Sequence, residues 1–351
     1  MLGIVEGYFG TAWSWSSRTA LMRFLAAHGY GFFIYAPKAD PYLRRRWREE
    51  YPAAMAQELA AFATACRAAG VRFGIGLSPF ESYFEDDSGV IVALERKLRF
   101  INEIGIDDLA LLFDDMRGDL PDLAKRQVRL TQYCAARTSA SRVLLCPSYY
   151  SNDPILDRVF GARPSRYLET LGAGLDPSVE IFWTGERICS TSFDPMDLAR
   201  VAGMMRRKPF LWDNYPVNDG PRMSQHLHLR AFAGRPASLR ELVAGHAINP
   251  ALQPMLSRIP ALTLRDSYRL GDGYDAAMAF AAAAQIVLGP ALAAMVTMDL
   301  PLLQDAGLDK IGPAKATLRA RYATVEHDAA REIVTWLDDG YGVSAEMVQT
   351  Q

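Results

Sequence analysis

The feature that most constrains the fold is a repeated alternation of short apolar runs with longer stretches of helical periodicity. Eight short runs are typical of β-strands. They begin at Leu2, Tyr30, Val71, Asp108, Arg142, Val179, Pro209 and Gly245. Between them lie helix-like stretches such as residues 53–70 and 90–105, each ending in a glycine suited to a helix C-terminus. Strands that alternate with helices predict a parallel sheet.

Eight strands are the number in a (β/α)8 barrel, and no glycine-rich dinucleotide fingerprint follows the first run. We therefore predict an α/β fold, with a TIM-type barrel over residues 1–261, rather than an open doubly wound sheet. From residue 262 the sequence is alanine-rich and amphipathic, and it has no further strand pattern. This predicts a small all-α C-terminal domain over residues 262–351.

One segment of this C-terminal part is apolar enough to raise the question of a membrane span. Residues 276–298 carry only Gln285 and Thr297 as polar residues, and their length would cross a bilayer. Alanine, which is weakly hydrophobic, is the commonest residue among them, and Gly289-Pro290 would break a helix in the middle. We predict two packed core helices and no membrane association.

Charge and cysteine content narrow the class of protein further. The chain has 38 basic and 40 acidic residues, which argues against nucleic-acid or anionic-membrane binding and favours a neutral or weakly charged small ligand. The first residues lack the charged and apolar regions of a secretory signal, so we expect a cytoplasmic protein. We also expect the widely spaced Cys66, Cys134, Cys146 and Cys189 to be reduced and mostly buried.

The strand ends carry polar residues of the kinds that catalysis uses, and barrel enzymes place their active sites at these ends. Asp114 and Asp115 directly follow an apolar run. Two like charges at one strand end crowd each other and raise one pKa, which would produce a general acid. The alternative is an N-cap in a solvated turn before a helix near Leu120.

A second strand end combines an aromatic ring with polar groups. Trp212, Asp213 and Asn214 close one strand, and Asp219 follows a few residues later. A pyranose stacks its C–H face on an aromatic ring while amides and carboxylates bind its hydroxyls, so this loop suits a sugar. The alternative is a core tryptophan beside an Asx-turn.

Two further strand ends are less specific. Lys38 follows another run and is suited to a ligand hydroxyl or to simple solvation, whereas we expect Trp183 to pack in the core. His226 and His228 lie close together in the sequence, but no further cluster of potential ligands accompanies them to complete a zinc site. The sequence also has no phosphate-binding loop and no serine or cysteine nucleophile motif. We therefore expect no metal and no cofactor.

Taken together, the motifs resemble glycoside hydrolase family 84, the β-N-acetylglucosaminidases that include the O-GlcNAcases and bacterial relatives once labelled hyaluronidases. The motifs that carry the resemblance are VEGYFG, YAPKAD, LLFDD, CPSYY, EIFWTG, FLWDNYPVND and AINP, in this order. The resemblance implies an exo-acting, retaining enzyme in which the substrate's 2-acetamido group attacks the anomeric carbon and forms an oxazoline. It also implies that Asp114 orients the acetamido N–H and that Asp115 acts as general acid and then base.

The same resemblance implies roles for the rest of the pocket. The backbone carbonyl of Gly7 and the side chains of Lys38, Asp219 and Asn249 would hold hydroxyls, Asn214 and Tyr150 would contact the acetamido group, and Trp212 would form a wall. The chain departs from the family pattern at Tyr8-Phe9, which reverses the usual order, and at Tyr149, which is new. Little of the C-terminal helical domain matches the family pattern. We expect this domain to offer a surface for a homodimer.

Two other functions are compatible with the sequence. A hexosaminidase of small glycans or glycosylated metabolites would keep the pocket and change the leaving group, in place of a glycosylated protein substrate. A sugar-binding or sensing protein whose catalysis has lapsed would have no use for a general acid, so the retention of both Asp114 and Asp115 argues against it.

Overall fold

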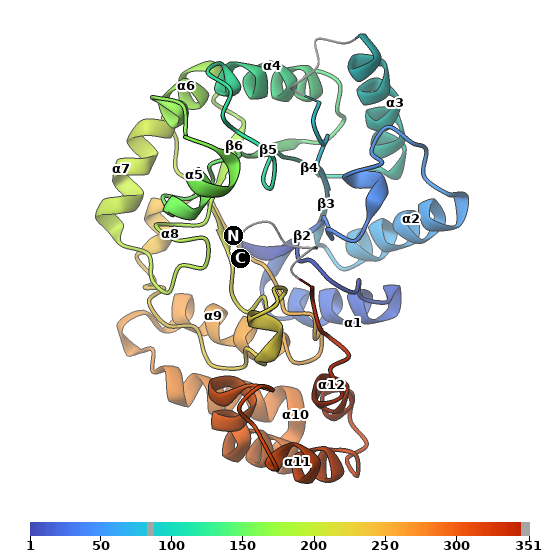
Figure 1. The fold of residues 1–351 in the computed structure, drawn as a ribbon, viewed down its shortest axis with the longest axis vertical. Coiled ribbons are helices and arrows are strands. Elements are labelled where there is room, and N and C mark those ends of the chain that lie inside the picture. Colours follow the sequence, from blue (N-terminus) through green and yellow to red (C-terminus); the bar gives the residue numbers. More distant parts are fainter. Residues whose placement is uncertain (83–87, 345–351) are drawn as a thin grey trace.

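The computed structural model describes residues 1–82 and 88–344. Within them, parallel strands form a closed barrel in the order β1 to β8, which confirms the predicted fold class (Figure 1). The strands are β1 (Leu2–Glu6), β2 (Tyr30–Tyr35), β3 (Arg72–Leu77), β4 (Asp108–Leu112), β5 (Arg142–Cys146), β6 (Glu180–Trp183), β7 (Phe210–Asp213) and β8 (Gly245–Ile248). The pairing of Leu2 with His246 closes the barrel between β1 and β8.

Helices surround the barrel and cover the outer face of its strands (Figure 1). They are α1 (Trp15–Ala26), α2 (Ala53–Ala68), α3 (Ser88–Ile104), α4 (Leu123–Ala135), α5 (Pro154–Phe160), α6 (Tyr167–Gly174), α7 (Pro195–Met205), α8 (Leu239–Leu242) and α9 (Arg258–Leu270), with 3₁₀ turns at η1 (Pro41–Leu43), η2 (Met223–Gln225) and η3 (Gly271–Gly273). Several of these helices begin at a residue whose side chain caps the helix N-terminus. At α7, for example, the Asp194 carboxylate accepts the Met196 N–H, and Pro195 occupies the first turn.

The strands are buried on both faces, which explains why each reads as a continuous apolar run. Side chains fill the barrel interior closely. A Cβ at Gly3 would lie 2.4 Å from the Phe32 ring, so only glycine leaves room for that ring between β1 and β2. The barrel is therefore a packed core, and its chemistry is confined to the loops at the strand ends.

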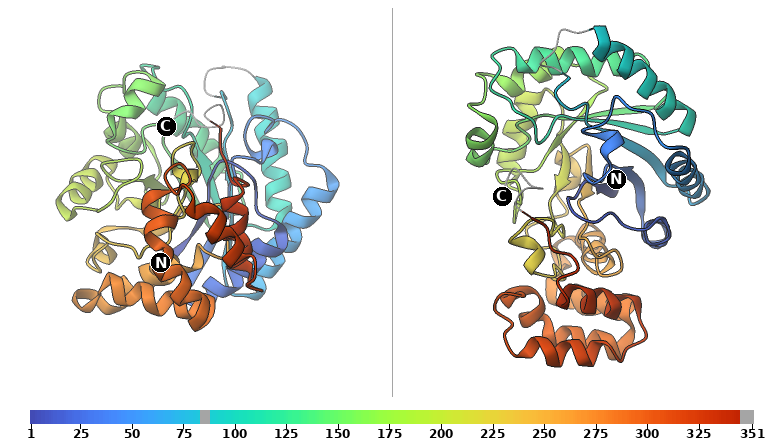
Figure 2. Two further views of the ribbon diagram at one scale, coloured as in Figure 1. Left: turned by 60° about the horizontal axis from the view of Figure 1, so that its bottom comes forward. Right: turned by 45° about the vertical axis from the view of Figure 1, so that its right-hand side comes forward.

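The C-terminal helices form a second cluster below the barrel (Figure 2, right). They are α10 (Ala276–Leu300), the π-helical turn η4 (Pro301–Ala306), α11 (Ala314–Tyr322) and α12 (Asp328–Leu337). Gly289 has a φ of 73° and a ψ of 165°, so α10 breaks where the sequence predicted. Among the described residues, one helical segment, Ala276–Ala306, is long enough and apolar enough to cross a bilayer. Half of its most apolar stretch is buried inside the protein.

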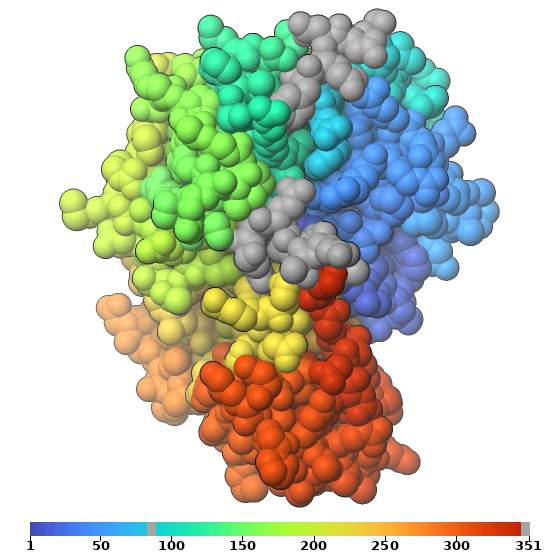
Figure 3. All heavy atoms as spheres, viewed as in Figure 1, coloured from blue at the N-terminus to red at the C-terminus, as the bar shows by residue number. Residues whose placement is uncertain are grey.

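Helix α9 joins the two clusters, and the boundary expected at residue 262 falls inside it. Ala261 and Leu264 pack into the barrel core, while Ile259 and Leu262 pack against the C-terminal helices. In the space-filling view the orange and red C-terminal helices form a lobe that meets the yellow barrel segment (Figure 3). One helix thus contributes to both hydrophobic cores.

Candidate active site

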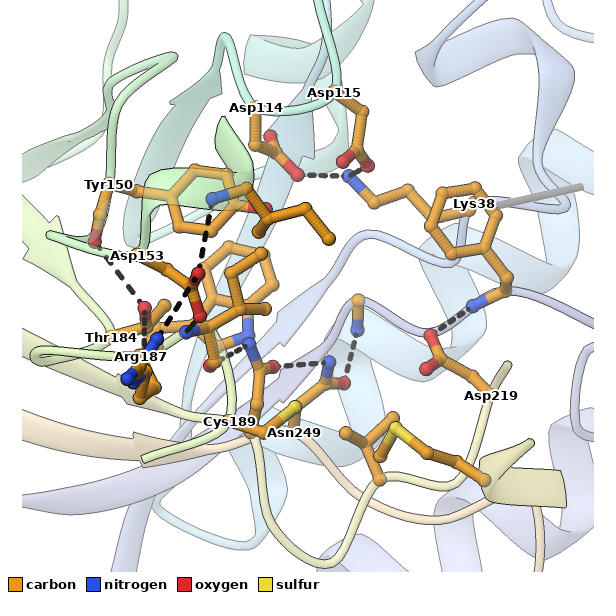
Figure 4. Close-up of a pocket in the computed structure, with 18 of the residues that line it drawn as sticks. Lys38, Asp114, Asp115, Tyr150, Asp153, Thr184, Arg187, Cys189, Asp219 and Asn249 are labelled. Atoms are coloured by element: carbon orange, nitrogen blue, oxygen red, sulfur yellow. Dashed lines mark hydrogen bonds and ion pairs between the residues drawn. The ribbon is translucent and has the colours of Figure 1, made fainter. Parts of the chain in front are cut away.

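A cavity of about 760 Å³ lies at the carboxyl ends of the barrel strands. Its wall includes all nine residues that the sequence predicted for the site: Gly7, Lys38, Asp114, Asp115, Tyr150, Trp212, Asn214, Asp219 and Asn249. They come from loops that are far apart in the chain, and Figure 4 shows most of them around the same space. The barrel topology alone brings them together, because parallel strands all end at one rim.

Asp114 and Asp115 follow β4, and both are buried. The chain before them is held by the neighbouring strand end: the Phe113 N–H donates to the Cys146 carbonyl at 2.9 Å. Asp115 has a φ of 57°, a left-handed conformation that aspartate tolerates better than most residues. This turn allows two consecutive side chains to line the same cavity. The N-cap alternative is wrong, because both carboxyl groups are buried and α4 begins only after Asp122.

Lys38 reaches the aspartate pair from the end of β2. Its backbone N–H donates to the Tyr8 carbonyl at 3.0 Å, and its ammonium donates to Asp114 Oδ2 and lies 3.3 Å from Asp115 Oδ2. The side chain is 4% exposed. The alternative of a simply solvated lysine is therefore wrong, and the ammonium faces the two carboxylates in addition to the cavity (Figure 4).

The two carboxyl groups have different electrostatic surroundings. Burial raises the pKa of Asp115, and the adjacent Asp114 raises it further, while Lys38 opposes both effects. Asp114 Oδ2 accepts the hydrogen bond from Lys38, whereas its buried Oδ1 has no hydrogen-bond partner among the described residues. An acceptor buried without a donor is unfavourable, so Oδ1 is suited to receive a ligand N–H. Asp115 is suited to hold a proton.

Asp219 and Asn249 anchor the loop after β1 on the opposite wall. Asp219 Oδ2 accepts the Phe9 N–H at 2.8 Å, and Asn249 Oδ1 accepts the Gly7 N–H at 3.2 Å. Burial raises the pKa of Asp219 to about 6, against the lowering effect of the Phe9 N–H. The same two side chains therefore line the cavity and fix its wall.

Trp212 forms the floor of the cavity against the backbone of Gly7. A Cβ at Gly7 would lie 2.3 Å from Cζ2 of the indole, so this close approach requires glycine. Asn214 is held by two contacts: its amide donates to the Ile188 carbonyl at 2.9 Å, and its carbonyl accepts from the Asn249 amide at 3.0 Å. The protein's own hydrogen bonds therefore fix the orientation of the Asn214 amide.

Comparison with known proteins identifies the family. A model described as beta-N-acetylglucosaminidase matches residues 2–299, which is most of the chain. The chain belongs to this family of glycoside hydrolases. This membership confirms the resemblance to glycoside hydrolase family 84.

The chain resembles two mammalian proteins and one solved bacterial structure. It is 28% identical over 281 residues to the Protein O-GlcNAcase of Mus musculus and to that of Rattus norvegicus. Each match covers 77% of this chain and 30% of the relative, so the chain spans under a third of their length. An O-GlcNAc hydrolase mutant from Thermobaculum terrenum has a TM-score of 0.79, with 26% identity over 96% of this chain and 80% of that one.

The sequence did not reveal the outer part of this cavity. Its lining residues lie in the segments after β5, β6 and β7: Asp153, Ile155, Arg158, Thr184, Arg187, Ile188, Cys189, Pro221, Arg222 and Met223. No local pattern marks them, because they converge only through the tertiary fold. Trp183 is buried in the core as predicted, whereas its neighbour Thr184 faces the cavity.

Two cysteines, Cys146 and Cys189, line the cavity, whereas His226 and His228 do not. Cys66, Cys134 and Cys146 are buried as predicted, but Cys189 is exposed, because it sits on the cavity wall instead of in the core. His226 contacts the Gln304 carbonyl, and His228 stacks on Tyr215. No group of three or more potential metal ligands occurs in residues 1–82 and 88–344.

Proposed function

We propose that this family member removes terminal β-linked N-acetylglucosamine with retention of configuration, using the substrate's own 2-acetamido group as nucleophile. The observation that carries the proposal is the pair of buried carboxyl groups, Asp114 and Asp115, with different surroundings at one strand end. One offers an unpartnered acceptor, and the other has a raised pKa. Different environments for two carboxyl groups support different roles.

In the first step, Asp114 Oδ1 accepts the acetamido N–H and makes the acetamido oxygen more nucleophilic. This oxygen forms a bond to the anomeric carbon while the bond to the leaving oxygen breaks, and Asp115 donates its proton to that oxygen. In the second step, Asp115 is a carboxylate and takes a proton from water. The water oxygen bonds to the anomeric carbon, the oxazoline ring opens, and the acetamido group is restored.

The remaining cavity residues support the placement of the sugar. Asp219, Asn249 and Lys38 carry groups that bind hydroxyls, and the carbonyl of Gly7 is a further acceptor on the same wall. Trp212, Tyr150 and Asn214 surround the space for the acetamido group, where the aromatic surfaces suit its methyl. Because the relatives are named for O-GlcNAc, we propose protein-linked N-acetylglucosamine as the substrate.

The experiment compares hydrolysis of an aryl β-N-acetylglucosaminide with that of the matching aryl β-glucoside, without added metal. We expect turnover of the acetamido sugar alone, because glucose has no internal nucleophile. Turnover of both sugars would contradict substrate assistance. Failure of the folded protein to cleave either one would favour a sugar-binding protein. A comparison of glycopeptides with small N-acetylglucosamine glycans then tests the proposed leaving group.

A further inference from the structure

Three arginines surround the outer part of the cavity, on the side of bulk solvent. Arg158 lies on α5 after β5, Arg187 lies in the loop after β6, and Arg222 precedes η2 after β7. All three are exposed, and all three line the cavity that contains Asp114 and Asp115. Separate elements therefore bring three positive charges to one opening.

Within residues 1–82 and 88–344, the positive charge at this opening is only partly balanced by carboxylates. The outer wall has one carboxylate, Asp153, whose Oδ1 lies 3.8 Å from Nη1 of Arg187. In the described part of the chain, Arg158 and Arg222 form no salt bridge. Arg187 is also the arginine that Figure 4 shows beside Asp153. Two of the three guanidinium groups thus keep their full capacity to bind an anion.

Apolar side chains line the same cavity as these arginines. Ile155, Ile188 and Met223 line the same outer wall. A ligand that fits this wall has an apolar part and a negative charge. The terminal N-acetylglucosamine is neutral and fills the inner cavity, so the negative charge belongs to the group that leaves.

We infer that Arg158, Arg187 and Arg222 form a subsite for an anionic leaving group, a carboxylate or a phosphate attached close to the glycosidic oxygen. The inference rests on the proposed function, because it takes the inner cavity as the site of the terminal sugar. Guanidinium groups match both anions through paired N–H donors. Each contact is exposed to solvent, so its effect on affinity is modest and depends on ionic strength.

The test compares two substrates that differ by one charge: the 4-nitrophenyl and the 3-carboxy-4-nitrophenyl β-N-acetylglucosaminides. The measured quantity is the ratio of kcat/KM for the anionic substrate to kcat/KM for the neutral one. We expect the Arg158→Gln, Arg187→Gln, Arg222→Gln triple variant to lower this ratio by at least about fivefold. Intrinsic differences between the two leaving groups cancel, because both proteins act on the same pair.

Two controls separate a local contact from a general charge effect. Arg331→Gln removes an arginine whose side chain is 68% exposed on α12, and it should leave the ratio unchanged. Raising the ionic strength from about 0.01 M to about 1 M shortens the Debye length from about 30 Å to about 3 Å, so the ratio of the native protein should fall. An equal ratio in the native protein and the triple variant would overturn the inference.

The two proposals fail in distinguishable ways. If the native protein cleaves neither glycoside, the proposed function fails. Calorimetric titration of the native protein and of the triple arginine variant then still gives the ratio of the Kd values for the anionic and the neutral glycoside, and arginine-independent binding would overturn the inference. A third glycoside with a phosphate ester at the same ring position distinguishes the anions: the charged group with the higher arginine-dependent kcat/KM is the one that the subsite prefers.

Discussion

Asp114 and Asp115 are adjacent in the chain, yet the structure gives them unequal tasks. Asp114 has one oxygen in contact with the Lys38 ammonium and one buried oxygen without a donor. Asp115 is 3% exposed, and its burial raises its pKa. Substitution of each carboxyl by an amide keeps the shape of the side chain and removes a different property at each position.

Asp115→Asn removes the proton donor, so its effect depends on how much help the leaving group needs. We expect kcat/KM to fall by about 10²–10⁴ for an alkyl glycoside and much less for a 4-nitrophenyl glycoside. Asp114→Asn places an amide near the acetamido N–H and should impair both substrates. Steady-state kinetics on the two glycosides checks this, and equal mild losses in both variants would contradict the assignment of roles.

Lys38 sets how far the pKa of Asp115 is raised, because its ammonium favours the ionised carboxylate. A general acid must be protonated, so kcat/KM falls as pH rises through the pKa of Asp115. Removal of the cation in Lys38→Gln should raise this pKa further and move the alkaline limb of the pH profile to higher pH, in addition to any loss of affinity. An unmoved or acid-shifted limb would show that Lys38 does not act on the acid.

Asp114, Asp115, Lys38, Trp212, Asn214 and Asp219 could be singled out in the sequence because they lie at or near strand ends, and strand ends meet at one rim of a barrel. The family resemblance, and no strand pattern, named Gly7, Tyr150 and Asn249. The sequence did not predict that Lys38 would lie between the two aspartates, since a side-chain contact between β2 and β4 has no local signal. Arg158, Arg187 and Arg222 were missed for the same reason. A lone arginine in a loop is usually a solvated residue, and only the fold shows that three of them converge.

The segments after β6 and β7 are connected by one buried arginine. Arg235 donates to both carboxylate oxygens of Asp213, at 2.9 and 2.7 Å, and to the carbonyls of Ser190, Thr191 and Ala233. Burial alone would raise the pKa of Asp213, but Arg235 and His246 outweigh it and hold that pKa below its ordinary value. Asp213 therefore does not line the cavity, unlike its neighbours Trp212 and Asn214.

Loss of this connection should be costly because it leaves a buried charge unpaired. We expect Arg235→Met to reduce the free energy of unfolding by about 3–5 kcal/mol. As a matched control, Arg319→Met breaks the exposed pair between α11 and Asp338, and it should cost far less than the loss of Arg235. Urea denaturation measures both values. Equal costs would mean that Arg235 has no special structural role.

A helix or strand can be predicted from the sequence when its own residues carry the pattern that stabilises it. The strands were found because burial on both faces leaves an uninterrupted apolar run, as in β4. The long segment between β7 and β8 has only the four-residue helix α8 and the turn η2, and no helical period announces them. The break in α10 was predictable, because Gly289 and Pro290 carry their backbone preferences locally.

The barrel and the C-terminal helices are joined by a buried acid as well as by apolar packing. Glu332 on α12 accepts the Met255 N–H at 2.8 Å and the Leu256 N–H at 2.9 Å, just before α9 begins. Burial raises its pKa to about 7, against the lowering effect of these two N–H groups and of Arg258. The connection between the two cores is therefore expected to respond to pH near neutrality.

The sign of that response follows from linkage. Glu332 binds its proton more tightly in the folded state, with a pKa of about 7 against an ordinary value of 4.5. Its contribution to stability is full below about pH 4.5 and is lost as pH rises through about 7, with an upper limit of about 3 kcal/mol. Glu332→Gln cannot ionise, so urea denaturation from about pH 5 to about pH 8 should show native stability falling relative to this variant. Asp219, with its pKa of about 6, is present in both proteins and cancels. Parallel stability curves would show that the ionisation of Glu332 is not coupled to the joining of the two cores.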